Sequence, residues 1–424
     1  MQTPLTPQIR GIPIGISTDR DSIASLQLRP SSGNMPLPVL TLDEAQFQAN
    51  TRLMLQFCSQ NGLKIAPHAK TPMSPDLAKR LIQAGAWGAS VANLQQAAVL
   101  LAHGVDHLIL ANEIGGRRSG ERLGQLLAQY PDAECLVFAD SPQALDALAA
   151  AGQTRKKPIS VLLELGAGRC GARDLPALKA LASHALDLGG LIAVRGIAAY
   201  EGSAEADSEE AKLEKIRALL QLCTQAATHV RSTFHLHKVV FSVGGSHYFD
   251  LVCEAVRQAG IPGLVPILRS GAIFFLDHGV YQRSLQEMDA RCRDAHGHPT
   301  SPAAQFAPAM RLWAEVLSHP EPDLYICGIG KRDVSHDLDL PVPLAVYRDG
   351  LRIAERTAIA AVKVTELNDQ HAFLTAQAAS APVLQPGDII EFGISHPCTC
   401  FDKWNLIYGL QGDTIAAAYR TCFG

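Results

Sequence analysis

The chain has 424 residues, 47% hydrophobic and 18% charged, which is enough apolar material for a large core and excludes wholesale disorder. Its net charge of −4, from 37 basic and 41 acidic residues, gives no electrostatic signal for nucleic acid. No apolar run approaches the ~20 residues of a membrane-spanning helix, and residues 1–30 lack the basic-then-apolar pattern of an export signal. We therefore expect a cytoplasmic enzyme with reduced cysteines and a small-molecule substrate, and with no nucleic-acid or membrane partner.

The middle of the chain repeats one unit, a short β-rich apolar run followed by a helical pattern. Helices are predicted to begin after the N-cap residues Ser74, Asn93, Ser141, Asp174 and Ser208. Strands are predicted at 63–66, 88–91, 107–110, 134–138, 159–164, 194–199, 239–242 and 264–268. Eight such units indicate an α/β domain with parallel strands, and eight is the number of a closed (β/α)8 TIM barrel. A doubly wound open sheet is the alternative that this count leaves open.

The pattern of apolar residues changes after about residue 276. Helical periodicity fades, and Gly/Pro turns separate alternating strand-like runs at 310–317, 324–328, 344–347, 358–364, 389–392 and 405–409. This pattern predicts a C-terminal, mostly antiparallel β domain, with residues 284–304 as a loop or insertion. The expected domains are an N-terminal extension (1–35) that packs on the β domain, a barrel (36–275) and the β domain (276–424).

A lysine follows the first predicted barrel strand, in the segment Pro67-His68-Ala69-Lys70-Thr71. In a barrel, catalytic residues lie at the C-terminal ends of strands. A lysine in that position can act as a Schiff-base nucleophile if its surroundings lower its pKa. The alternative is a solvated surface lysine beside a turn.

Glycine-rich segments follow three other strands. Residues 166–171 match the dinucleotide pattern G-x-G-x-x-G, but four strands precede them and the next helix begins only near Asp174. A loop that presents Arg169 therefore fits better than a dinucleotide site. Residues 242–246 and 269–271 follow the seventh and eighth strands, where barrels bind phosphate groups. These two loops predict a cofactor that bears a phosphate.

Histidine and cysteine side chains stand two residues apart at His396 and Cys398. In an extended segment both would point to one face, and both are ligands that suit Zn2+. Two protein ligands would leave open positions for substrate, as in a catalytic site. A chance pair in a loop is the alternative, and Cys398 with Cys400 could instead form a redox or structural element.

Together these segments resemble the D-serine dehydratase and D-threonine aldolase family, which are pyridoxal phosphate enzymes of fold type III with an alanine-racemase-like barrel. Among them the chain is most similar to bacterial D-serine deaminase-like amino acid deaminases. The resemblance begins near residue 38 and rests on residues 67–71, 163–164, 168–171, 199–203, 242–246, 269–271, 277–281, 330–333, 368–371 and 396–398.

The resemblance implies a role for individual residues. Lys70 would carry the cofactor and take the α-proton, Arg169 would lie beside the phenolic oxygen, and Tyr200 would lie near the pyridine ring as a second catalytic residue. The metal ligands would be His396 and Cys398, with Zn2+ or another divalent ion. Tyr281 would face the substrate. The full cofactor site would comprise His68, Lys70, Arg169, Tyr200, Ser242, Gly244, Gly245 and Ser246.

The resemblance implies a dehydratase of D-serine or related β-hydroxy D-amino acids that releases a 2-oxo acid and ammonia, in a homodimer. A D-threonine aldolase, which yields glycine and an aldehyde, is the alternative, and a non-catalytic pyridoxal phosphate protein a more distant one. Aldolase-like members carry Asp at the position of Cys398, so Cys398 favours the dehydratase. Cys400 replaces a Thr common in dehydratase-like members, and Thr71-Pro72-Met73 departs from the usual sequence after the lysine.

Overall fold

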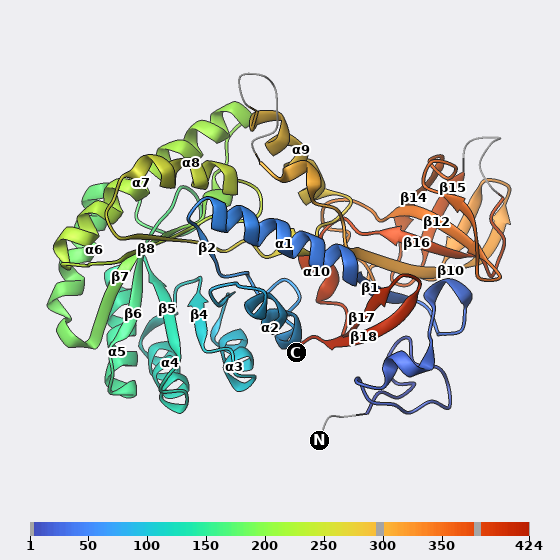
Figure 1. The fold of residues 1–424 in the computed structure, drawn as a ribbon, viewed down its shortest axis with the longest axis horizontal. Helices are drawn as coiled ribbons and strands as arrows, with labels where there is room; N and C mark the ends of the chain where they lie inside the picture. The colour runs from blue at the N-terminus through green and yellow to red at the C-terminus, as the bar shows by residue number, and fades with distance from the viewer. Residues whose placement is uncertain (1–3, 294–300, 377–382, 424) are drawn as a thin grey trace.

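The computed structural model describes residues 4–293, 301–376 and 383–423. Two lobes are apparent in Figure 1, a barrel built from the first part of the chain and a β lobe built mainly from the last part. Helix α1 (Glu44–Gln60) runs along the junction of the two lobes. None of the helices in the described ranges is long and apolar enough to cross a membrane.

Eight parallel strands form the barrel in the order β2-β9-β8-β7-β6-β5-β4-β3. The barrel closes between β2 and β3, because Ser90 N–H donates to Pro67 O (2.9 Å) and Trp87 N–H donates to Ile65 O (2.8 Å). The closed barrel is therefore confirmed, and the open doubly wound sheet is excluded. The strands are β2 (Lys64–Ile65), β3 (Ala89–Val91), β4 (His107–Leu110), β5 (Glu134–Ala139), β6 (Ile159–Leu165), β7 (Ile192–Ala199), β8 (Val239–Val243) and β9 (Leu264–Leu268).

Helices connect successive barrel strands. At the N-caps of four of them, the side chains of Asn93, Ser141, Asp174 and Ser208 accept a backbone N–H, as the sequence predicts, while Ser74 occupies an N-cap without such a bond. The barrel interior is filled by a separate apolar cluster that includes Phe138. The helices are α2 (Pro75–Gln83), α3 (Leu94–Ala102), α4 (Gly116–Gln129), α5 (Pro142–Arg155), α6 (Leu175–Asp187), α7 (Glu209–Thr233) and α8 (Phe249–Ala259).

The second lobe is a mostly antiparallel sheet with the main order β13-β12-β16-β10-β1-β17-β18, and β11, β15 and β14 extend it from β10. The predicted β domain is thus confirmed. Its strands are β1 (Val39–Asp43), β10 (Met310–Glu321), β11 (Leu324–Cys327), β12 (Val342–Arg348), β13 (Leu351–Glu355), β14 (Val362–Leu367), β15 (Ala372–Ala376), β16 (Ile389–Gly393), β17 (Leu406–Gln411) and β18 (Thr414–Arg420).

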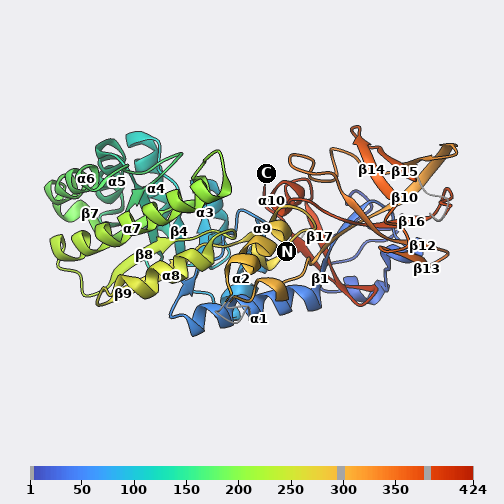
Figure 2. The ribbon, with the colours of Figure 1, turned by 90° about the horizontal axis from the view of Figure 1, so that it is seen from above.

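One expected loop is partly wrong. Helix α9 (Val280–Arg291) occupies the start of the region 284–304, and residues 294–300 of that region lie outside the described residues. Only Ser284, Leu285 and Met288 of the helix are buried, so its apolar stripe is too narrow to stand out in the sequence. Helix α9 and the short helix α10 (Pro397–Phe401) lie between the two lobes in both views (Figures 1 and 2).

The N-terminal residues pack against the β lobe. Leu5, Ile12 and Ile23 are buried in one cluster with Trp313 and Tyr408 of the sheet. We retain the division at residues 35 and 275 as a proposal. Strand β1, which precedes the barrel in the chain, nevertheless belongs to the antiparallel sheet, where it pairs with β10 and β17.

Candidate active site

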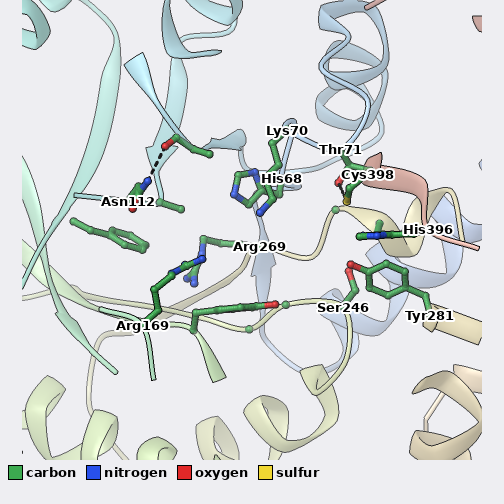
Figure 3. Close-up of a pocket in the computed structure, with 18 of the residues that line it drawn as sticks. His68, Lys70, Thr71, Asn112, Arg169, Ser246, Arg269, Tyr281, His396 and Cys398 are labelled. Atoms are coloured by element: carbon green, nitrogen blue, oxygen red, sulfur yellow. Dashed lines mark hydrogen bonds between the residues drawn. The ribbon is translucent and has the colours of Figure 1, made fainter. Parts of the chain in front are cut away.

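A cavity of about 340 Å³ lies at the C-terminal ends of the barrel strands, against α9 and α10 of the second lobe (Figure 3). It brings together residues from opposite ends of the chain. Of the residues singled out in the sequence, those that line it are His68, Lys70, Arg169, Tyr200, Gly244, Gly245, Ser246, Tyr281, His396 and Cys398. The remaining one, Ser242, is fully buried at the end of β8.

The lysine segment follows β2 directly and includes the bridge that closes the barrel, between His68 and Ser90. Burial lowers the pKa of His68 well below its usual value, and the nearby cations Lys70 and Arg269 lower it further. The imidazole is therefore neutral. Its Nδ1 atom is buried and has no hydrogen-bond partner in the described part of the chain. A neutral ring with an unsatisfied nitrogen beside a lysine suits contact with a polar heterocycle.

Arg169 and Tyr200 form the opposite wall, from the loops after β6 and β7. The Arg169 guanidinium lies over the Tyr200 ring, 5.8 Å from its centroid. Burial, together with the neighbouring Glu201 carboxylate, raises the pKa of Tyr200 to about 12, so the phenol keeps its proton at neutral pH. This wall therefore presents one fixed cation and one neutral hydroxyl.

The glycines before Arg169 serve close packing. A Cβ on Gly168 would lie 2.2 Å from Ser203 O, and α6 begins only at Leu175, well after the glycines. A dinucleotide site needs the helix to open at the glycines themselves. The segment is thus a tight loop that presents Arg169 to the cavity.

The loops after β8 and β9 are joined into one unit. Arg269 N–H donates to Gly244 O (2.9 Å), and Ser270 Oγ donates to Gly245 O (2.5 Å). Gly244 has a φ of +107°, and a Cβ there would lie 2.5 Å from Leu268 Cδ2, so only glycine fits. Gly245 N–H donates to Glu201 Oε1 (2.8 Å) and so is not available to a ligand.

Amide groups remain for an anion at this unit. Among the described residues, the amides of Ser246 and Gly271 have no hydrogen-bond acceptor, and both residues line the cavity. Backbone N–H groups in a glycine-rich loop form a cradle for phosphate. The cradle therefore fits a phosphate group, although Gly245 contributes shape and an oriented carbonyl rather than its own N–H.

Arg269 is a structural residue of the site whose role the sequence did not reveal. Its guanidinium donates to Ser242 Oγ (2.9 Å) and Ala199 O (2.7 Å), and the residue is only 5% exposed. It thereby ties together the ends of β7, β8 and β9, and it is itself one of the residues that line the cavity (Figure 3). Ser242 accordingly contacts Arg269 instead of lining the cavity, and no pattern in the sequence distinguishes a buried arginine from an exposed one.

His396 and Cys398 meet at the start of α10, on the side of the cavity formed by the second lobe (Figure 3). His396 has extended backbone but Cys398 lies in the helix, so the uniformly extended segment expected from the sequence is wrong; the helical turn still places both in the cavity. Thr71 Oγ1 lies 3.3 Å from Cys398 Sγ. Burial raises the pKa of Cys398, but hydrogen bonds with His396 and Thr71 outweigh it and leave the pKa below the usual thiol value.

Two further residues near His396 and Cys398 differ in their roles. Asp337, which the sequence analysis missed, places Oδ2 2.7 Å from His396 Nδ1 and accepts from Thr399 Oγ1 with its other oxygen (2.8 Å). This leaves His396 Nε2 for a metal, and an imidazole nitrogen with a thiolate sulfur is a donor set that fits Zn2+. Cys400 is fully buried outside the cavity lining, and burial raises its pKa to about 12, so it is a core thiol.

Tyr281, at the first turn of α9, completes the wall beside the histidine. Its ring stacks on His247 at 4.6 Å between centroids and lies 6.2 Å from the ring of His396. The Asp277 carboxylate accepts the backbone N–H of Tyr281 (3.1 Å), which fixes the start of the helix. Tyr281 is thereby held rigidly toward the proposed metal ligands.

Comparison with known proteins agrees with this architecture. Residues 42–252 match the family model "Alanine racemase, N-terminal domain", and residues 309–410 match "Putative serine dehydratase domain". The chain resembles the D-serine dehydratase and D-threonine aldolase family over both of its lobes. Members of this family are pyridoxal phosphate lyases that use a metal ion, and the chain is an enzyme of the lyase class.

Two curated members are similar over long stretches. D-threonine aldolase of Arthrobacter sp. is 28% identical over 362 residues, which cover 85% of each chain. D-threo-3-hydroxyaspartate dehydratase of Delftia sp. (strain HT23) is 29% identical over 245 residues, 57% of this chain and 61% of the relative.

Solved structures share the fold. D-threonine aldolase from Filomicrobium marinum has a TM-score of 0.72 at 22% identity and covers 91% of this chain and 95% of its own. The Delftia dehydratase has a TM-score of 0.71 at 23% identity, with 94% and 100% covered. Both support the alanine-racemase-like barrel with an attached β domain.

Proposed function

We propose that this enzyme is a pyridoxal phosphate- and metal-dependent dehydratase of D-serine or related β-hydroxy D-amino acids, which releases a 2-oxo acid and ammonia. The observation that carries the proposal is the pairing of Cys398 with His396 in the same cavity as Lys70. The thiol at this position distinguishes the dehydratase-like from the aldolase-like pattern described above.

The cavity has a place for each part of pyridoxal phosphate. The cradle formed by the loops after β8 and β9 would hold the phosphate, Lys70 would bind the aldehyde carbon, and Arg169 would lie beside the phenolic oxygen. Tyr200 and the neutral His68 would border the ring. When bound, this cofactor supplies an electron sink for negative charge at the α-carbon of the substrate.

A divalent cation, for which zinc is our proposal, would be held by His396 Nε2 and Cys398 Sγ. When bound, it supplies a Lewis acid that assists departure of the poorly leaving β-hydroxyl group. The relatives support this assignment. Solved structures of the Delftia dehydratase include a variant with a cysteine replaced, described as metal-free, and one with a histidine replaced two positions earlier, the same spacing as in His396 and Cys398.

The remaining side chains position the substrate and move a proton. Lys70 Nζ is the base that takes the α-proton, and Tyr200 keeps its phenolic proton beside the ring. Thr71, adjacent to this lysine, contacts Cys398 and so links the proton-transfer side of the cavity to the metal side. Tyr281, fixed by its stacking on His247, would border the β-substituent of the substrate.

Product analysis tests the proposal against the aldolase alternative, which the similarity to D-threonine aldolase keeps open. Incubated with D-threonine, the enzyme should release 2-oxobutyrate and ammonia, and with D-serine pyruvate and ammonia. Lys70→Ala should abolish both reactions, and Cys398→Asp should reduce dehydration, whereas Cys400→Thr should retain it. Glycine and acetaldehyde as the main products from D-threonine would overturn the proposal.

We also propose that the enzyme is a homodimer, as the family resemblance implies. Light scattering after size exclusion should then give twice the chain mass of 45.4 kDa. A mass equal to that of one chain at micromolar concentration would contradict this proposal.

A further inference from the structure

A cluster of acidic side chains lies on the barrel side of the cavity, away from the His396–Cys398 pair. It comprises Glu113 after β4, Asp140 after β5, Glu164 in β6 and Cys170 in the loop after β6. One oxygen from each carboxylate and the sulfur of Cys170 all lie within 4.8 Å of one another. In Figure 3, Asn112 and Arg169, which adjoin this cluster in the sequence, lie across the cavity from His396 and Cys398.

The cluster has few hydrogen-bond donors for its buried carboxylate oxygens. Glu164 is only 5% exposed, and in the described ranges neither its Oε2 atom nor Glu113 Oε1 has a hydrogen-bond partner, although both atoms are buried. In the part of the chain that the structure describes, the one backbone donor to these carboxylates is Gly171 N–H, which donates to Asp140 Oδ2 (3.1 Å). Burying unpaired carboxylate oxygens costs several kcal/mol, so such a group needs a proton or a cation.

Two nearby arginines, Arg269 and Arg173, do not meet that need directly. Arg269 attracts Glu164 through space, but its guanidinium donates to Ser242 and Ala199. Arg173 is likewise occupied, because it donates to Cys170 O (2.9 Å) and Gly168 O (2.6 Å). Burial and the contact with Glu113 raise the pKa of Glu164 to about 9, and burial and the same glutamate raise the pKa of the Cys170 thiol. Protons on these two groups would satisfy the glutamate pair and the thiol, but would leave the approach of the Asp140 carboxylate to the same atoms without a cause.

We propose that Glu113, Asp140, Glu164 and Cys170 form a second divalent-cation site, separate from the His396–Cys398 pair. Three carboxylates and one thiolate form a mixed oxygen and sulfur donor set, which suits zinc better than magnesium or calcium. Ligands of a tetrahedral zinc ion lie roughly 3.5 Å apart, so the four atoms close in slightly when the ion binds. The ion anchors the loop that carries Arg169, because Cys170 is its direct neighbour.

Metal counting tests this proposal whether or not the proposed reaction is correct. The protein, purified with its cofactor, is stripped with a chelator, reloaded with Zn2+ and analysed by plasma mass spectrometry. We expect two ions per chain in the wild type, one in the double variant His396→Ala/Cys398→Ser, and one in Cys170→Ser or Glu164→Gln. Cys422→Ser, which alters a half-buried thiol outside both sites, is the matched control and should retain two.

Glu164→Gln keeps the size and polarity of a protonated carboxyl group, so it should preserve the fold while removing an anionic ligand; circular dichroism checks this. In the double variant, zinc-edge X-ray absorption should show one sulfur ligand at about 2.3 Å, and Cys170→Ser should remove it. One ion in the wild type that is lost with His396 and Cys398 would overturn the proposal, as would a second ion that persists in both Cys170→Ser and Glu164→Gln.

Discussion

The Nδ1 atom of His396 lies 2.7 Å from Oδ2 of Asp337, a residue 59 positions earlier in the chain. Such a carboxylate fixes both the tautomer and the orientation of a metal-binding imidazole. Asp337 itself is held by Thr399, which lies one residue beyond Cys398. The two proposed ligands and the carboxylate behind them therefore form one hydrogen-bonded unit.

Asp337→Asn should weaken metal binding about 10- to 100-fold, the usual cost of losing such a carboxylate. Binding of pyridoxal phosphate should not change, because Asp337 is outside the cavity lining. Zinc titration by calorimetry and the visible absorption of the bound cofactor measure the two effects separately.

Asp339→Asn is the matched control for this change. Its carboxylate pairs with Arg283 (2.7 Å) and not with His396. Its backbone oxygen, which accepts from Ser395 Oγ (2.8 Å), is unaltered by the substitution. We expect wild-type zinc affinity for this variant. Equal affinities of Asp337→Asn and wild type would show that Asp337 does not position the histidine.

Removal of the metal should abolish turnover and leave the cofactor in place. The residues proposed to hold pyridoxal phosphate lie at Lys70 and at the ends of the barrel strands, whereas the proposed ligands lie on α10. Chelation followed by absorption spectroscopy and an assay with D-serine checks this, and added Zn2+ should restore activity. Unchanged turnover in protein shown to be metal-free would refute the catalytic role of the ion.

Much of the barrel and its site was predictable because the relevant signals are local. Apolar runs followed by N-caps such as Ser141 and Asp174 mark strand–helix units, and the C-terminal ends of barrel strands necessarily meet. A residue directly after a strand, such as Lys70, is therefore expected at the same end of the barrel as the phosphate loops, whereas the role of Tyr200 is implied only by the family resemblance. The two phosphate loops followed from the same rule.

The remainder depends on contacts between distant parts of the chain. Strand β1 belongs to the second sheet because it pairs with β10, for example Thr41 with Arg311. The five residues of β1 do not themselves indicate this pairing. The same holds for Asp337, whose importance arises only when α10 brings His396 to it. Strand β13 is not predicted because it has only five residues, and its apolar Leu351 and Ile353 are exposed and do not face the core.

His278 should make stability depend on pH. Burial lowers its pKa to about 3, and Arg311 and Arg356 contribute, whereas the histidine of an unfolded chain has a pKa near 6.5. The native state therefore binds fewer protons between these values, and stability falls as the pH drops below about 6.5. Between pH 7.5 and pH 5 this group should cost about 2 kcal/mol.

Urea unfolding of His278→Leu at the two pH values measures this effect. The loss of stability on acidification should be smaller in the variant than in wild type by about that amount. His103→Leu, at an exposed position, should lose as much stability between the two pH values as wild type does. An identical pH dependence in His278→Leu and wild type would exclude the buried histidine as the cause.

Glu201 should be needed to shape the phosphate cradle. The residue is fully buried, and its Oε1 accepts the N–H of Gly245 (2.8 Å). Glu201→Ala leaves that N–H unpaired, which should cost about 1–3 kcal/mol of stability and weaken retention of pyridoxal phosphate. Because burial raises the pKa of Glu201, the neutral amide in Glu201→Gln is a close substitute and should preserve most of both.

Cofactor dissociation, followed by absorption during dialysis, and urea unfolding distinguish these two variants of Glu201. Glu205→Ala, at an exposed position in the same loop region, should match wild type in both measurements. A rate of cofactor loss that is the same in Glu201→Ala and wild type would show that the Gly245 amide needs no partner to hold the cradle. Equal loss in the Ala and Gln variants would instead show that the negative charge, and not the hydrogen bond, is what the loop requires.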